Sequence, residues 1–129
     1  MRLLLDTHAL VWWFMADRRL SQRAREAIGD PDNQPVVSSA TIWEIATKNR
    51  LGKMPPEISD LAREMPDRLT ELGHELMPID PAHAQLSGSL EGQHRDPFDR
   101  MLAAQSKLEK VPLVTRDPVF AAFGVVCLW

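Results

Sequence analysis

Residues 94–120 read HRDPFDRMLAAQSKLEKVPLVTRDPVF, and this stretch decides the fold class. Asp96 precedes a proline and opens a segment, 96–110, whose apolar residues recur at helical spacing. The apolar run 111–115 predicts a buried strand, and a second Asp-Pro pair at Asp117 opens a short helix over 117–124. The stretch therefore predicts a helix, a strand and a helix in succession, with acids at the ends of these elements.

The same alternation extends to both ends of the chain. Strands are expected at 2–5, 35–39, 74–79, 111–115 and 125–129. Helices are expected at 9–15, 16–30, 40–52, 55–73, 80–90, 96–110 and 117–124. Ser21 is the expected N-cap of the second helix and Gly29 its end, and Pro66 must kink or split the fourth. Strands alternating with helices predict an α/β fold: a parallel sheet of about four to five strands with helices on both faces.

Bulk composition bounds the class of protein. The 129 residues predict one domain over 1–129, and a net charge of −3 does not mark a nucleic-acid binder. A single cysteine, Cys127, allows no disulfide within the chain and favours a reducing compartment. We find no signal peptide and no run of about 20 apolar residues, so we expect a cytoplasmic protein with no membrane contact.

Acidic residues follow several of the predicted strands. Asp6 ends the first strand, Glu44 follows the second, and Asp117 follows the fourth. The carboxyl ends of parallel strands share one edge of the sheet, where α/β proteins bind ligands. Asp99, near the start of the helix 96–110, can join them.

Helix capping is the alternative role for these acids. Aspartate is a favourable N-cap, and Asp6, Asp96 and Asp117 all fit that role. Asp99 can act as the capping-box partner behind Asp96. Glu44 lies past the capping position, at the border of the apolar stripe of its helix, and capping does not explain it.

Carboxylates that share one crevice repel one another unless protons or a cation offset the charge. Oxygen ligands without a histidine or cysteine cluster favour Mg²⁺ or Mn²⁺ over zinc. Of the four histidines, only His8 and His94 lie next to these acids.

Four segments carry a resemblance to a known family: LLLDTHALVWW (3–13), SSATIWEIATKNRLGKM (38–54), HRDPFDRMLAAQS (94–106) and PLVTRDPVFAAFGVVCLW (112–129). In this order the chain resembles PIN-domain ribonucleases, and more closely the VapC toxins of bacterial type II toxin–antitoxin pairs. The resemblance implies a Mg²⁺- or Mn²⁺-dependent endoribonuclease that hydrolyses RNA phosphodiester bonds.

The resemblance also implies roles for individual residues. The metal-binding and catalytic acids are Asp6, Glu44, Asp99 and Asp117, and Asp96 is a ligand, an outer partner or a cap. Hydroxyls that orient an acid or a bound water come from Thr7, Ser39 and Thr115. The neighbouring cations Arg95, Arg100 and Arg116 are candidates for RNA phosphate contacts.

The resemblance further implies a cognate VapB-like antitoxin and a homodimer or toxin–antitoxin hetero-oligomer. Trp12, Trp13 and Phe14 are consecutive, and a helix cannot bury all three on one face, so we expect one to be exposed or covered by another chain. The alternative is that the following helix of the same chain covers it. Competing functions are a non-catalytic PIN-fold RNA- or protein-binding module and a receiver-like phosphoacceptor domain.

Overall fold

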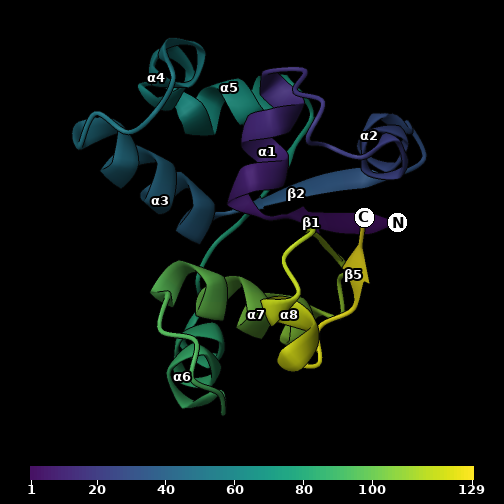
Figure 1. Ribbon diagram of the computed structural model, residues 1–129, viewed down its shortest axis with the longest axis vertical. Coiled ribbons are helices and arrows are strands. Elements are labelled where there is room, and N and C mark those ends of the chain that lie inside the picture. Colours follow the sequence, from purple (N-terminus) through teal and green to yellow (C-terminus); the bar gives the residue numbers. More distant parts are fainter.

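A single five-stranded parallel sheet organises the molecule (Figure 1). The computed structural model describes residues 1–129. The strands are β1 (Arg2–Leu5), β2 (Gln34–Ser38), β3 (Glu75–Met77), β4 (Leu113–Val114) and β5 (Cys127–Leu128). The helices are α1 (Thr7–Phe14), α2 (Gln22–Gly29), α3 (Ser39–Arg50), α4 (Pro56–Ala62), α5 (Met65–Glu71), α6 (Pro81–Ser89), α7 (Pro97–Glu109) and α8 (Val119–Ala122). The predicted α/β class and parallel sheet are confirmed.

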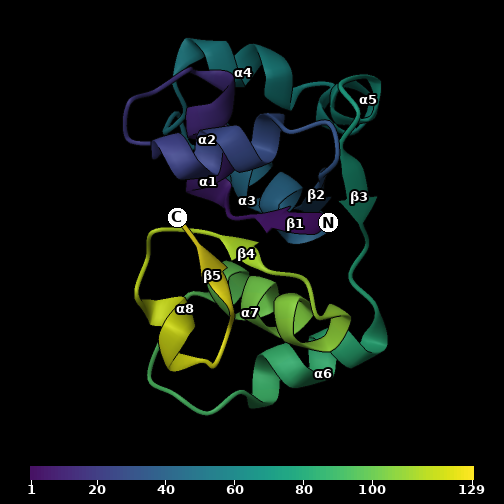
Figure 2. The ribbon, with the colours of Figure 1, turned by 90° about the vertical axis from the view of Figure 1, so that its right-hand side faces the viewer.

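The sheet order is β3-β2-β1-β4-β5, so β1 lies at the centre. Leu3 and Leu5 of β1 pack into one apolar cluster and Leu4 into a second, because successive side chains of a strand point to opposite faces. Figure 2 shows α1 to α5 on one side of the sheet and α6 to α8 on the other. The continuous apolar run of β1 is therefore explained by helices on both faces, as expected.

Most element boundaries follow the local sequence signals. Ser21 accepts a hydrogen bond from the Ala24 amide at 3.0 Å and caps α2, which ends at Gly29 as predicted. Asp80 caps α6 in a capping box with His83. Strand β2 stops at Ser38, which caps α3, so Ser39 begins a helix and does not end a strand.

The expected helix at 55–73 is two helices, α4 and α5, with the break at Arg63 and Glu64. Pro66 lies in the first turn of α5, where its missing amide hydrogen leaves no helical hydrogen bond unmade. The predicted split is confirmed, and it precedes the proline because a proline is tolerated only at the start of a helix.

The aromatic run in α1 is covered by its own chain. Trp12 is buried, and Trp13 and Phe14 are half-buried. The indole of Trp13 approaches Gly29 of α2. The intrachain alternative is therefore the correct one, and this run does not argue for a partner. No helix of the structure is both long and apolar enough to cross a membrane.

Candidate active site

Five carboxylates line one small cavity at the carboxyl ends of β1, β2 and β4. The cavity has a volume of about 80 Å³. Its lining residues are Asp6, Thr7, His8, Glu44, Lys48, Asp96, Asp99, Asp117 and Phe120. The structure thus brings together all five acids that the sequence singled out, from segments that span most of the chain.

Two of these acids, Asp6 and Asp96, also cap helices, and Asp117 bonds the first amide of α8 from just outside that helix. Oδ1 of Asp6 accepts a 2.6 Å hydrogen bond from the Ala9 amide at the start of α1. Oδ1 of Asp96 accepts from the amides of Phe98 and Asp99 at 2.9 and 3.1 Å. Oδ1 of Asp117 accepts from the Val119 amide at 3.0 Å. Capping and membership of the acidic cavity are therefore compatible, because one carboxylate oxygen is enough for the cap.

Glu44 is held on both of its carboxylate oxygens. The hydroxyl of Thr7 donates a 2.6 Å hydrogen bond to Oε1, and the ammonium of Lys48, one turn further along α3, donates to Oε2. Glu44 is buried, with 5% of its surface exposed, so it needs such partners. The sequence analysis missed Lys48, although its i,i+4 spacing from Glu44 placed both on one face of the helix.

Asp99 pairs with a histidine. Its Oδ2 lies 2.8 Å from Nε2 of His94, and both side chains are partly buried. The carboxylate thus contacts His94, and the backbone amide of Asp96 is not its partner as a capping box would require. His94 therefore lies directly beside the acidic cavity.

Burial and crowding raise the pKa of two of the acids. The pKa of Asp6 is raised from 3.8 to about 6, chiefly by burial, against the opposing effect of the Thr115 hydroxyl and the Ala9 amide. The pKa of Asp99 is also raised, first by burial and then by the charges of Asp96 and Glu44, while His94 opposes the shift. Burial is the larger cause of both shifts, and the charge of neighbouring carboxylates adds to each.

The remaining predicted residues lie around the cavity and do not line it. Thr115 is buried, and its hydroxyl accepts from the Asp117 amide at 3.1 Å. Ser39 lies half-buried in the first turn of α3 and makes no side-chain hydrogen bond near the acids. Thr7 and Thr115 therefore contact acids, whereas Ser39 does not.

The three arginines predicted to contact RNA phosphates differ in whether other groups of the protein already bind their guanidinium groups. Arg100 is occupied: its guanidinium donates to the carbonyls of Ser87 and His94 at 3.0 Å and to that of Leu90. Arg95 is exposed and lines an open hollow of about 840 Å³ that Arg100 and His94 also border. The guanidinium of Arg116 lies over the Trp12 ring, 4.5 Å from its centroid, and remains exposed.

A second group has ligand atoms close enough for a cation: Asp80, His83 and Glu109 lie within 4.8 Å of one another. Nδ1 of His83 accepts the Asp80 amide hydrogen at 3.1 Å, so the proton of a neutral imidazole is on Nε2. Nε2 donates it to Oε1 of Glu109 at 2.8 Å and has no lone pair for a metal. We interpret this group as a clamp between α6 and α7.

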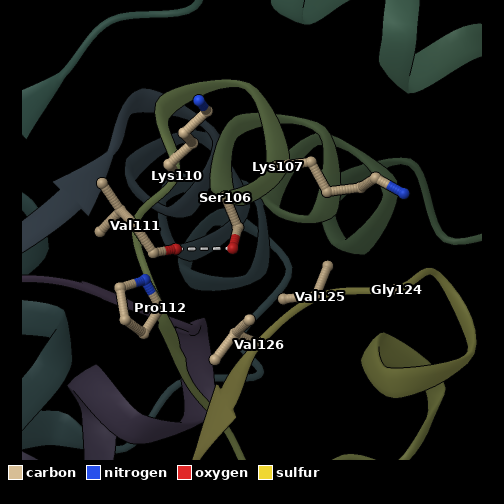
Figure 3. Close-up of a pocket in the computed structure, with 8 residues that line it drawn as sticks. All are labelled: Ser106, Lys107, Lys110, Val111, Pro112, Gly124, Val125 and Val126. Atoms are coloured by element: carbon tan, nitrogen blue, oxygen red, sulfur yellow. Dashed lines mark hydrogen bonds between the residues drawn. The ribbon is translucent and has the colours of Figure 1, made fainter.

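A further cavity, of about 320 Å³, lies at the opposite edge of the sheet (Figure 3). It is bordered by the residues that precede β4 and β5 and by the end of α7, including Lys107 and Lys110. The hydroxyl of Ser106 donates a 2.6 Å hydrogen bond to the Val111 carbonyl inside it. No carboxylate lines this cavity, so it does not compete with the acidic cavity as a metal site.

The model of the PIN domain family matches residues 3–126. The chain belongs to the PIN domain family. The resemblance to PIN domains that the sequence indicated is therefore confirmed.

One relative of this PIN domain is named as a ribonuclease. Ribonuclease VapC16 of Mycobacterium tuberculosis is 39% identical over 59 residues, which are 46% of this chain and 41% of the relative. The match thus spans less than half the length of that curated relative.

Solved structures support the fold over the full length. VapBC2 from Rickettsia felis, bound to a DNA fragment from its promoter, has a TM-score of 0.71 at 15% identity and covers 99% of this chain and 98% of its own. The sarcin-ricin loop cleaving toxin VapC20 of Mycobacterium tuberculosis has a TM-score of 0.67 at 15% identity, with 96% of each chain covered. At this identity the likeness concerns the fold of the PIN domain.

Proposed function

We propose that this PIN domain is a Mg²⁺-dependent endoribonuclease that acts as the toxin of a toxin–antitoxin pair. The observation that carries the proposal is the gathering of five carboxylates in one cavity of about 80 Å³. The cavity offers mainly hard oxygen donors and no thiol, which suits Mg²⁺ or Mn²⁺. The raised pKa values of Asp6 and Asp99 are consistent with it: burial is the larger cause, and nearby carboxylate charge, which a cation would offset, adds to each shift.

Asp6, Glu44, Asp99 and Asp117 would hold the metal, with Asp96 beside them. When bound, the ion lowers the pKa of a water and offsets charge on the phosphate. Asp117 is exposed at the rim and is the better placed acid to accept a proton from that water, since both oxygens of Glu44 already have partners. Thr7 and Thr115 hold their neighbouring acids in position.

The hollow beside the cavity offers a path for RNA. His94 borders this hollow and contacts Asp99, so the hollow adjoins the acids. Arg95 and Arg116 supply exposed cations for phosphates, whereas Arg100 supports the end of α6 and the loop that follows it. The substrate proposed is single-stranded or looped RNA, which would place the protein in the cytoplasm.

The partner proposed is a VapB-like antitoxin, within a homodimer or a toxin–antitoxin hetero-oligomer. The names of VapC16 and VapBC2 support it. On α3, Trp43 is 59% exposed and offers an aromatic side chain for such a contact. Size-exclusion chromatography after coexpression with the antitoxin tests this proposal. If the chain elutes as a monomer without bound antitoxin, the partner proposal is refuted.

The nuclease proposal is tested by cleavage of single-stranded RNA by the purified chain. We expect activity in Mg²⁺, none in EDTA, and none in Asp99→Asn, with an unchanged far-ultraviolet circular dichroism spectrum. Asp60→Asn, which removes an exposed charge on α4, is the matched control and should cleave like the wild type. Wild-type rates in Asp99→Asn would contradict the assignment.

A further inference from the structure

Lys48 is the only lysine or arginine among the nine residues that line the acidic cavity. It faces five carboxylates there, so it is the one permanent positive charge of the site. A fixed ammonium in this position lowers the electrostatic cost of gathering the acids.

The contact of Lys48 is with one defined oxygen. Its ammonium is bonded to Oε2 of Glu44, while Thr7 occupies Oε1. The Glu44 side chain is 7% exposed, and that of Lys48 is 37% exposed. The carboxylate is therefore fixed and buried, whereas the ammonium lies on a flexible stem that reaches the mouth of the cavity.

We propose that Lys48 is a resident counter-cation that holds Glu44 in the metal-free protein and competes with a divalent ion for Oε2. The inference rests on the proposed metal site. An ion that takes Glu44 as a ligand needs the lone pairs that Lys48 engages, and it also meets the repulsion of the ammonium. Lys48 thus sets the affinity of the site for its cation and stabilises the site before the cation binds.

The alternative is that Lys48 is an ordinary surface ion pair of α3. Exposed i,i+4 pairs contribute little to stability, and their removal changes nothing at a distance. The two interpretations differ because only a resident cation of the cavity alters metal binding when it is removed.

The experiment uses Mn²⁺ alone as the probe, titrated by calorimetry into the purified full chain. The variants are Lys48→Met, which keeps the apolar stem, Lys48→Arg, which keeps the charge, and Lys53→Met. Lys53 is exposed just beyond α3 and outside the cavity, so it controls for the change in net charge. We expect Lys48→Met to bind Mn²⁺ about tenfold more tightly, and the other two within about twofold of the wild type.

Thermal unfolding in EDTA gives a second readout that needs no metal. Lys48→Met should melt about 4 °C below Lys53→Met, because buried Glu44 loses its partner, and Lys48→Arg should not. Saturating Mn²⁺ should remove most of this difference.

The outcomes separate the two proposals. If the wild type binds Mn²⁺ and Lys48→Met binds it no more tightly than Lys53→Met, the inference about Lys48 is overturned and the metal site stands. If the wild type binds no Mn²⁺, the proposed function is overturned and this inference with it.

Discussion

Thr7 and Glu44 are joined by a 2.6 Å hydrogen bond that links the first residue of α1 to the second turn of α3. Both side chains are buried, and 37 residues separate them in the chain. This contact fixes the direction of an acid that helix capping does not explain. The hydroxyl that follows the first acid thus holds a second acid, which lies on the helix after the neighbouring strand β2.

Replacement of Thr7 by valine should lower RNA cleavage by about 10- to 100-fold, because Glu44 loses the bond that orients it. It should also lower the free energy of unfolding by about 1–2 kcal/mol, since a buried acceptor loses its donor. Thr7→Ser keeps the hydroxyl and should retain most activity. Cleavage rates and urea unfolding measure both effects, and an active Thr7→Val would contradict the role.

Asp6→Asn should stabilise the metal-free protein at pH 7. The folded state binds the Asp6 proton more tightly than the unfolded state does. The stability that protonated Asp6 contributes is therefore fully present below pH 3.8 and is lost as the pH rises to about 6. Asparagine carries no charge to bury and still caps α1, so we expect a gain of about 3 kcal/mol. Unfolding in EDTA at pH 5 and pH 7 measures it; a variant less stable than the wild type at pH 7 would be inconsistent with the raised pKa.

His74→Leu should also stabilise the protein, and His74 does not line the acidic cavity. Neither ring nitrogen of His74 makes a hydrogen bond, and burial lowers its pKa below 6.5. Stability from a base with a lowered pKa is present above pH 6.5 and is lost as the pH falls. The variant should gain about 1 kcal/mol at pH 7 and more at pH 5, measured by thermal unfolding, with cleavage unchanged. An unaltered pH dependence would refute this account.

Arg95→Ala should weaken RNA binding without altering the fold. Binding is best measured in the Asp99→Asn background, where RNA is not cleaved. If Arg95 contacts one phosphate, its loss should reduce the slope of log affinity against log salt by about one. Arg100→Ala should act differently: it releases the carbonyls of Ser87 and His94 and should lower thermal stability. Equal salt slopes in Arg95→Ala and the wild type would exclude the phosphate contact.

Glu109→Gln should lower stability slightly and leave Mn²⁺ binding unchanged. Its carboxylate accepts from His83, and the amide keeps an oxygen acceptor at reduced charge. Calorimetric titration with Mn²⁺ against the wild type provides the measurement. Loss of a binding event in Glu109→Gln would show that the α6–α7 clamp is a cation site.

The position of the acids was predictable because it depends on topology. Once β1, β2 and β4 are read as parallel strands, the residues that follow them meet at one edge. Glu44 was the most informative residue, because its place at the border of an apolar stripe has no capping explanation. The α/β class and the caps at Ser21 and Asp80 follow from equally local signals.

The contacts of long side chains were not predictable in this way. Arg100 was a candidate for phosphate, yet its guanidinium bonds the carbonyls of Ser87 at the end of α6 and of Leu90 and His94 in the following loop, whose course no pattern specifies. The contacts of His94 and Lys48 could not be predicted for the same reason, because they depend on side-chain rotamers and on the path of the loop. Strands β4 and β5 are also shorter than their apolar runs, because only two residues of each pair with a neighbour.

The sheet order has a consequence for the newly made chain. Strand β4 lies beside central β1, so the acid that follows it reaches the others only after residues 1–117 have left the ribosome. A shorter nascent chain has Asp6 and Glu44 but lacks the neighbour strand that completes the edge. The acidic cavity therefore cannot form during synthesis until Asp117 has been made and β4 has paired with β1.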